Sequence, residues 1–274
     1  MNELHLQDLL NKIKNIETFA HDNGLNIHPT CRIKQAEQLI NRFLSSNYNP
    51  PTDYEFPWKA YYEGIRDIAE ISFICQMLSQ DHLDDLKKHW NTLIKGANTP
   101  DQDSDSLARN IQFQLFFSAH FKKQGYPIEI NEPDFLFNHH EKWYGVAAKR
   151  LSSANNLDKR VQEGVRQINE SNYPGFVAIS FDRIFQPNGG EKLASETIFS
   201  QSSAYPLLEQ TVNSYVSQIT KRLKNSCLGF IGFLKILYYP ESGLSLFIDS
   251  AEKWYPRSDA DEELRTLIKE MAEK

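Results

Sequence analysis

Apolar residues in the first part of the chain recur every three or four positions, which is the spacing of one helix face. Across residues 6–16, leucine and isoleucine occupy the same side of an amphipathic helix. The same spacing predicts three further helices, at residues 36–43, 58–78 and 81–94. Residues 1–96 are therefore predicted to form a helical N-terminal region.

A polar segment follows this region. Residues 97–106 contain no apolar residue larger than alanine or proline, a composition typical of a connection between structural units. Beyond this segment the hydrophobic period changes. We therefore expect the chain to divide into a helical region at 1–96, a linker at 97–106 and a larger domain at 107–274.

The larger domain alternates helices with short strands. In chain order the pattern predicts a helix at 107–123, strands at 128–130, 134–137 and 143–151, a helix at 156–169 and a strand at 175–181. An irregular segment at 184–206, a helix at 207–223, strands at 228–238 and 244–248, and a last helix from 258 onward follow. This order is typical of a mixed sheet flanked by helices. The predicted fold class is therefore α/β (α+β).

Cysteine usage and hydropathy indicate a compartment. Cys31, Cys75 and Cys227 are scattered and odd in number, which favours a reducing environment over a disulfide framework. The most apolar stretch, residues 227–239, is interrupted by Lys235 and is too short to span a bilayer. The first fifteen residues mix charged and apolar positions, unlike a secretory signal. We expect a cytoplasmic protein with no membrane partner.

The net charge of −6 is unevenly distributed along the chain. Residues 105–240 hold 15 Lys and Arg against 12 Asp and Glu, whereas the remainder holds 15 against 24. A mildly basic middle with acidic flanks is compatible with phosphate contact, and equally with an ordinary solvated surface. Charge alone therefore leaves a nucleic-acid partner open.

Four short motifs in the larger domain resemble the core of one nuclease superfamily. They are Glu-Pro-Asp-Phe at 132–135, Tyr-Gly-Val-Ala-Ala-Lys-Arg-Leu-Ser-Ser at 144–153, Arg-Gln-Ile at 166–168 and Gly-Phe-Val-Ala-Ile-Ser at 175–180. Their order, with strands and a helix between them, resembles the PD-(D/E)XK nucleases. The resemblance covers residues 107–183, and it implies a restriction-endonuclease-like sheet for the larger domain.

The resemblance implies an activity and two of its residues. Asp134 matches the metal-binding aspartate of the family, and Lys149 matches its lysine. A divalent cation, Mg²⁺ or Mn²⁺, would polarise the phosphate and generate hydroxide near neutral pH. The lysine would orient the attacking water or stabilise developing charge. The implied reaction is metal-dependent hydrolysis of phosphodiester bonds in nucleic acid.

The second carboxylate of the family pattern is missing. Strand alternation places Ala147 on the same face as Lys149, where the acid should stand, and a methyl group cannot bind a metal. Some restriction endonucleases of the superfamily carry this acid on the next helix, at a Lys-X13-Glu spacing, and Glu163 has that spacing here. Glu163 is thus the candidate second metal ligand. The alternative is a solvated carboxylate paired with Arg160 or Arg166.

Further polar residues surround the expected site. A neutral Gln114 stands where the family often has a glutamate on the preceding helix, and Gln114 either faces the site or lies on the solvated side of that helix. The residues expected to contact nucleic acid or to position groups are Gln114, Arg150, Lys159, Arg160 and Gln167.

Asp182 and the turn at residues 139–141 are weaker candidates for metal binding. Asp182, at the end of the following strand, is a reserve acid. His139, His140 and Glu141 occupy a hairpin tip, where adjacent side chains are expected to point apart. These three are therefore interpreted as turn residues and not as a metal cluster.

Two hypotheses from different classes follow. The first is a metal-dependent nuclease acting on nucleic acid, with DNA the preferred expectation, in bacterial defence or mobile-element biology. Its catalytic residues would be Asp134, Lys149 and Glu163. The second is a catalytically inactive scaffold of the same fold that binds nucleic acid or a protein, with Ala147 and Gln114 as marks of lost activity. In either case the N-terminal helices would offer a surface for a homodimer or a protein partner. An unrelated α/β protein with coincidental motifs is the remaining alternative.

Overall fold

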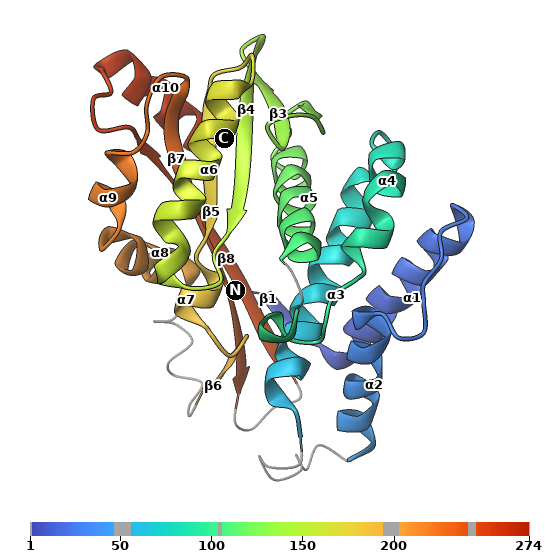
Figure 1. Ribbon diagram of the computed structural model, residues 1–274. Helices are drawn as coiled ribbons and strands as arrows, with labels where there is room; N and C mark the ends of the chain where they lie inside the picture. The colour runs from blue at the N-terminus through green and yellow to red at the C-terminus, as the bar shows by residue number, and fades with distance from the viewer. Residues whose placement is uncertain (1, 47–55, 104–105, 194–202, 241–244, 274) are drawn as a thin grey trace. The chain divides into compact units, whose positions relative to one another are not determined.

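The computed structural model describes residues 2–46, 56–103, 106–193, 203–240 and 245–273 (Figure 1). The chain forms two compact units, each assembled from three segments. Unit 1 comprises Met1–Gln112, Gln186–Gln201 and Ile236–Asp249, and unit 2 comprises Phe113–Phe185, Ser202–Lys235 and Ser250–Lys274. The segments of the two units therefore alternate along the sequence.

Unit 1 is built mainly from helices. Four of them are α1 (Leu6–Asp22), α2 (Arg32–Ser45), α3 (Trp58–Leu78) and α4 (Leu83–Leu93), followed by the short 3₁₀ helix η1 (Pro100–Gln102). The apolar stripe of α1 is buried at Leu9, Ile13 and Ile16. Burial of that stripe explains why an amphipathic sequence forms a stable helix here. The helical character predicted for this part of the chain is confirmed.

Unit 1 also contains short strand pairings that the hydrophobic pattern does not predict. Strand β1 (Asn2–His5) pairs antiparallel with the start of β8 (Ser245–Pro256). Strand β6 (Glu191–Leu193) pairs parallel with the end of β7 (Cys227–Pro240). The prediction of an irregular segment across residues 184–206 is wrong for β6. A three-residue strand is too short to display a two-residue period, so only its pairing identifies it.

A buried ionic network lies inside unit 1, centred on Asp67 of α3. Asp67 is 2% exposed, and Arg32 Nη1 lies 2.8 Å from its Oδ1. Arg109 Nη1, from the first turns of α5 (Leu107–Lys123), lies 3.2 Å from both carboxylate oxygens. Gln112 Nε2 donates to Oδ1 at 3.0 Å. A carboxylate without water needs such partners, because an unpaired buried charge is costly.

The same network fixes the polar segment that follows α4. Asp103 Oδ2 accepts a hydrogen bond from Arg109 Nε at 2.6 Å, and Asp103 Oδ1 accepts one from the Ala97 N–H at 2.6 Å. Arg109 Nη2 donates to the Ala97 carbonyl oxygen at 2.8 Å. Composition suggests only a connector here, whereas Asp103 anchors this segment against α5.

Unit 2 contains a six-stranded mixed sheet. Its strand order is β8-β7-β5-β4-β3-β2, and β7 and β8 enter it with their residues Cys227–Lys235 and Ser250–Pro256. The other strands are β2 (Ile128–Glu129), β3 (Phe135–His139), β4 (Lys142–Arg150) and β5 (Gly175–Ser180). Strands β2, β3 and β4 pair antiparallel, whereas β4, β5 and β7 pair parallel. The predicted mixed sheet is confirmed.

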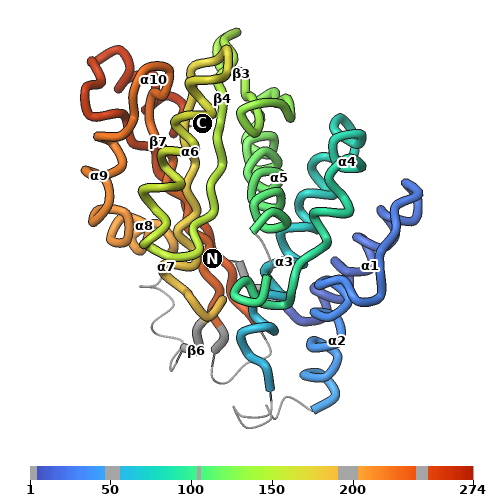
Figure 2. The backbone as a smooth tube through the Cα atoms, in the orientation of Figure 1, coloured from blue at the N-terminus to red at the C-terminus, as the bar shows by residue number. Residues whose placement is uncertain are grey.

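Helices cover both faces of this sheet. On one face, Phe117 and Phe121 of α5 pack against Phe135 of β3, with ring centroids 6.3 Å and 5.3 Å apart. On the other face lies α6 (Leu157–Glu170), which connects β4 to the parallel strand β5 (Figure 1). Figure 2 follows the same backbone from α5 through the β3–β4 hairpin to α6. Side chains of β4 that point away from α5 therefore lie on the face of the sheet that α6 covers.

The remaining described helices belong to unit 2. They are η2 (Ala154–Asn156), α7 (Asp182–Phe185), α8 (Ala204–Asn213), α9 (Val216–Thr220) and α10 (Glu262–Ala272). The single helix predicted at residues 207–223 is wrong, because the chain turns between α8 and α9. Tyr215 lies at that turn, and its ring stacks on Phe181 with centroids 6.1 Å apart. Packing of this side chain against the sheet replaces continuation of the helix.

Replacing Gly164 with alanine should lower the free energy of unfolding by about 1–3 kcal/mol, the usual cost of overpacking a filled core. A Cβ at this position would lie 2.7 Å from Val177 Cγ1 and 3.0 Å from Cγ2, so α6 would have to move off β5. Urea-induced unfolding followed by circular dichroism measures the change. Arg166→Ala, at an exposed position of the same helix, is the control and should stay within about 0.5 kcal/mol of wild type. Equal stability of the two variants would contradict this account of the packing.

Candidate functional site

Asp134 and Lys149 form an ion pair in unit 2. Asp134 immediately precedes β3, and Lys149 is the penultimate residue of β4. Lys149 Nζ lies 3.0 Å from Asp134 Oδ2, which also accepts a hydrogen bond from the Ala148 N–H at 2.7 Å. The Asp134 and Lys149 side chains are only 15% and 11% exposed. The aspartate and lysine singled out from the sequence therefore lie together, largely shielded from water.

Two glutamine side chains hold the backbone beside this pair. Gln114 Nε2 of α5 donates to the carbonyl oxygen of Asp134 at 2.7 Å, and Gln167 Nε2 of α6 donates to that of Pro133 at 3.3 Å. A carbonyl oxygen only accepts, so each contact fixes which end of the amide faces it. Gln167 Oε1 therefore points elsewhere, and it is buried without a hydrogen-bond partner among the described residues. Such an acceptor is suited to a ligand.

Ala147 of β4 and Glu163 of α6 lie at the same height along the interface between α6 and the sheet. Ala147 is fully buried and pairs with Val177 of β5. Val177 is the residue against which Gly164 packs. Glu163 directly precedes Gly164, so its backbone lies at the level of the position where the family pattern has an acid.

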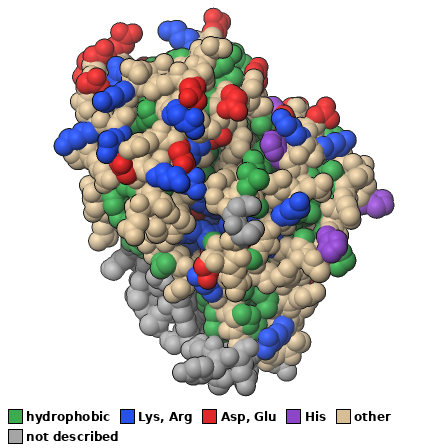
Figure 3. All heavy atoms as spheres, in the orientation of Figure 1, with side chains coloured by type: hydrophobic (Ala, Val, Ile, Leu, Met, Phe, Trp, Pro, Cys, Tyr) green, Lys and Arg blue, Asp and Glu red, His purple; other side chains and the backbone are tan. Residues whose placement is uncertain are grey.

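The Glu163 carboxylate is occupied by basic neighbours on its own helix. Arg160 Nη1 lies 2.8 Å from Glu163 Oε2, and Lys159 Nζ lies 4.0 Å from Oε1. Glu163 is 31% exposed and Lys159 74% exposed. Figure 3 shows blue and red side chains intermingled on the visible face, in place of one continuous basic patch. Lys159, Arg160 and Glu163 thus form a local ion-paired group on α6.

Arg150 lies apart from Lys149, although the two are adjacent in sequence. Strand alternation directs it to the face covered by α5, where its guanidinium lies 5.7 Å from the centre of the Phe113 ring. Arg150 Nη2 is 3.6 Å from Asp182 Oδ2, and both residues are buried. Asp182 Oδ1 accepts a hydrogen bond from the Lys235 N–H at 2.7 Å. Contact of Arg150 with a phosphate would require it to leave this buried position, and the reserve acid Asp182 is held beside it.

Burial governs the protonation of Asp134. Removal from water raises the pKa of this carboxyl above its ordinary value of 3.8, although the Lys149 ammonium and the Ala148 N–H both favour the ionised form. The net direction is upward. Burial therefore destabilises the ionised form of Asp134, and a cation bound to the carboxylate would offset that destabilisation.

This shift makes stability depend on pH with a definite sign. A carboxyl with a raised folded-state pKa favours folding below its unfolded value of 3.8, and it loses that contribution as pH rises through the folded value. The stability of Asp134→Asn relative to wild type should therefore increase with pH. Asp101→Asn is the matched control: the hydrogen bond from Lys59 lowers the pKa of Asp101, so its relative stability should fall as pH rises. Urea unfolding at a series of pH values measures both slopes, and slopes of the same sign would contradict the assignment.

Two oxygens of residues at this site accept no hydrogen bond from the described residues, namely Asp134 Oδ1 and Gln167 Oε1. Both donors to the Asp134 carboxylate reach Oδ2, and among the described residues none reaches Oδ1. Mg²⁺ is commonly held by one or two carboxylates together with water and substrate oxygens. Asp134 with a neutral Gln167 oxygen fits such a cation, more weakly than two carboxylates would. Glu163 could join only by leaving Arg160.

The structure also brings together a group that the sequence analysis dismisses. The side chains at the β3–β4 turn are predicted to point apart, and this is wrong for His139 and His140, whose ring centroids are 4.0 Å apart. Glu270 of α10 completes the group, with one ligand atom of each residue within 4.8 Å of the others. Glu270 lies more than a hundred positions away in the chain. The adjacency of His139 and His140 is the sequence feature that points to this group.

Unit 2 thus combines a six-stranded mixed sheet flanked by helices with a buried aspartate–lysine pair at the ends of two neighbouring strands. No family model matches the chain, and no curated protein or solved structure matches it either. Among the described residues, no helix is long and apolar enough to cross a membrane.

Proposed function

We propose that the chain hydrolyses phosphodiester bonds of nucleic acid with the help of a divalent cation, using a restriction-endonuclease-like unit 2. The observation that carries the proposal is the contact of 3.0 Å between Lys149 Nζ and Asp134 Oδ2. It joins two of the four motifs of the resemblance at adjacent strand ends. The element order α5-β2-β3-β4-α6-β5 supports the same proposal, because it is the order that the resemblance implies.

In this proposal Asp134 binds the cation through its carboxylate, and Gln167 offers its buried carbonyl oxygen. The cation, Mg²⁺ or Mn²⁺, supplies Lewis-acid activation of the phosphate and lowers the pKa of bound water. Lys149 opposes the effect of burial on the pKa of Asp134 and would present a positive charge beside the reacting phosphate. Gln114 and Gln167 hold the Pro133–Asp134 backbone in place.

A second function is favoured by a separate observation. Glu163 is ion-paired with Arg160, and Ala147 offers no ligand, so of the two expected metal ligands only Asp134 is without an arginine partner among the described residues. A cation site with one carboxylate binds weakly. The alternative proposal is therefore a nuclease-like scaffold that binds nucleic acid without cleaving it.

The test is a cleavage and binding assay of the full chain. Single- and double-stranded DNA and RNA are incubated with Mg²⁺, with Mn²⁺ and with a chelator, and retention of the same substrates is measured in parallel. Cleavage that requires the cation supports the hydrolase. Retention without cleavage in either cation supports the scaffold, and neither retention nor cleavage would overturn both proposals.

A further inference from the structure

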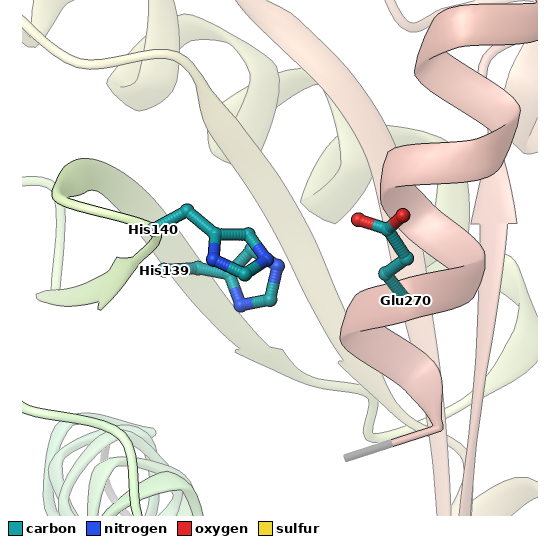
Figure 4. Close-up of side chains that lie close together, drawn as sticks. All are labelled: His139, His140 and Glu270. Atoms are coloured by element: carbon teal, nitrogen blue, oxygen red, sulfur yellow. The ribbon is translucent and has the colours of Figure 1, made fainter.

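A second cluster of ligand-type side chains lies at the far end of the β3–β4 hairpin. His139 is the last residue of β3, His140 follows it in the turn, and Glu270 projects from α10 toward both rings (Figure 4). One ligand atom from each of the three side chains lies within 4.8 Å of the other two. His139 is buried, whereas His140 and Glu270 are exposed.

The conformation of the turn explains why two adjacent histidines point the same way. His139 pairs with Lys142, so His140 and Glu141 form a two-residue hairpin loop. Both have positive φ, 49° and 63°, as a type I′ turn requires. Asparagine and glycine usually fill these positions, because other residues are strained there. The left-handed backbone ends strand alternation at His139 and turns the His140 ring onto its neighbour.

We propose that His139, His140 and Glu270 bind a transition-metal ion of the Zn²⁺ class. Two imidazoles and one carboxylate form a donor set that Zn²⁺ uses, with metal–ligand distances of about 2.0–2.2 Å. The spacing of 4.8 Å must contract on binding, and the two exposed side chains are able to move inward. Mg²⁺ prefers oxygen ligands, so this set selects a different metal from the one proposed at Asp134.

The surroundings suit a cation with an open coordination position. His140 and Glu270 line a cavity of about 730 Å³. Four acidic residues and two basic ones face this cavity, namely Asp261, Glu262, Glu263, Glu270, Lys142 and Arg257. The excess of negative charge attracts a cation. With three protein ligands, a water molecule or a small ligand in the cavity would complete a tetrahedral site.

This site is separate from the Asp134–Lys149 pair. Asp134 precedes β3 and His139 ends it, so the two positions are about 16 Å apart along the strand, at about 3.3 Å per residue. Zinc binding at this site can therefore be tested independently of nuclease activity. Its binding would tie the β3–β4 hairpin to α10 within unit 2.

The experiment is calorimetric titration of the chelator-treated, dialysed full chain with ZnCl₂, supported by Co²⁺ absorption spectra as a probe of tetrahedral geometry. Wild type should bind one Zn²⁺ per chain. His140→Asn keeps a residue that tolerates positive φ, and Glu270→Gln keeps the size of the side chain. Loss of outer partners of a metal ligand already costs about 10–100-fold in affinity, so each variant should bind at least about tenfold more weakly.

Matched controls keep the result specific. His21→Asn removes a histidine that is 90% exposed, and Glu273→Gln removes an acid from the end of α10. Both should bind zinc as wild type does, and circular dichroism should show all four variants folded. Absence of zinc binding by wild type, or wild-type affinity in both His140→Asn and Glu270→Gln, would overturn the proposal.

Discussion

Replacing Lys149 with methionine should lower the rate of metal-dependent cleavage by about 10²–10⁴-fold, the range measured when a group that handles protons or charge at a reacting centre is lost. The ammonium opposes the effect of burial on Asp134, so its removal raises the pKa of that carboxyl further. At a given pH, a smaller fraction of the proposed metal-binding carboxylate is then ionised. The residual activity should therefore also shift toward higher pH, which initial rates measured across a pH series will show.

The control for this experiment is Lys14→Met, which removes an exposed lysine of α1 and should cleave at the wild-type rate. Asp134→Asn removes the proposed metal-binding carboxylate itself and should abolish cleavage at every pH. A Lys149→Met protein with wild-type rates would exclude the lysine from the mechanism. An unchanged pH profile with a reduced rate would mean that Lys149 acts on the phosphate and not through Asp134.

Replacing Asp67 with alanine should lower the free energy of unfolding by about 3–5 kcal/mol, as removal of one partner from a buried ion pair does. Burial alone would raise the pKa of Asp67, but the guanidinium groups of Arg32 and Arg109 hold it below its ordinary value. Without the carboxylate, these two buried arginines lose their common counter-charge. Urea-induced unfolding of the full chain measures the loss.

Asp101→Ala is the matched control, because Asp101 pairs with Lys59 at an exposed position. This replacement should lower the free energy of unfolding by no more than about 1 kcal/mol. Acid provides an independent check. A carboxyl with a lowered folded-state pKa contributes stability above its unfolded value of 3.8 and loses it as pH falls through the folded value. The difference between wild type and Asp67→Ala should therefore shrink in acid, and a difference independent of pH would contradict the ionic account.

Local periodicity was sufficient for the longer elements of the fold. The apolar stripe of α1 and the continuous apolar run of β4 are both long enough to stand out from the background. Elements defined by distant partners were not recoverable. Strand β1 has only four residues, and it exists because it pairs with the start of β8. Strand β8 itself extends to Pro256, beyond its predicted end at residue 248, and its neighbour in the sheet is β7.

The candidate site divides in the same way. The resemblance implied that Asp134 and Lys149 share a site, and the β3–β4 hairpin brings the two side chains together. It left open whether Glu163 faces the metal or Arg160, since helical spacing allows both, and the structure has Arg160 in contact. The His139–His140–Glu270 group was missed because strand alternation fails at a left-handed turn, and because α10 is remote in the sequence.

The alternation of segments between the two units has a consequence for synthesis of the chain. Asn2 pairs with Ile248, so β1 has no partner until residue 248 has left the ribosome. The helices α1 to α4 can form early, but their unit stays incomplete until Asp249 has emerged. Contacts this distant in sequence make folding slow and leave apolar surface uncovered during translation. We therefore expect the helices of unit 1 to expose apolar surface until the segments that complete the unit have been synthesised.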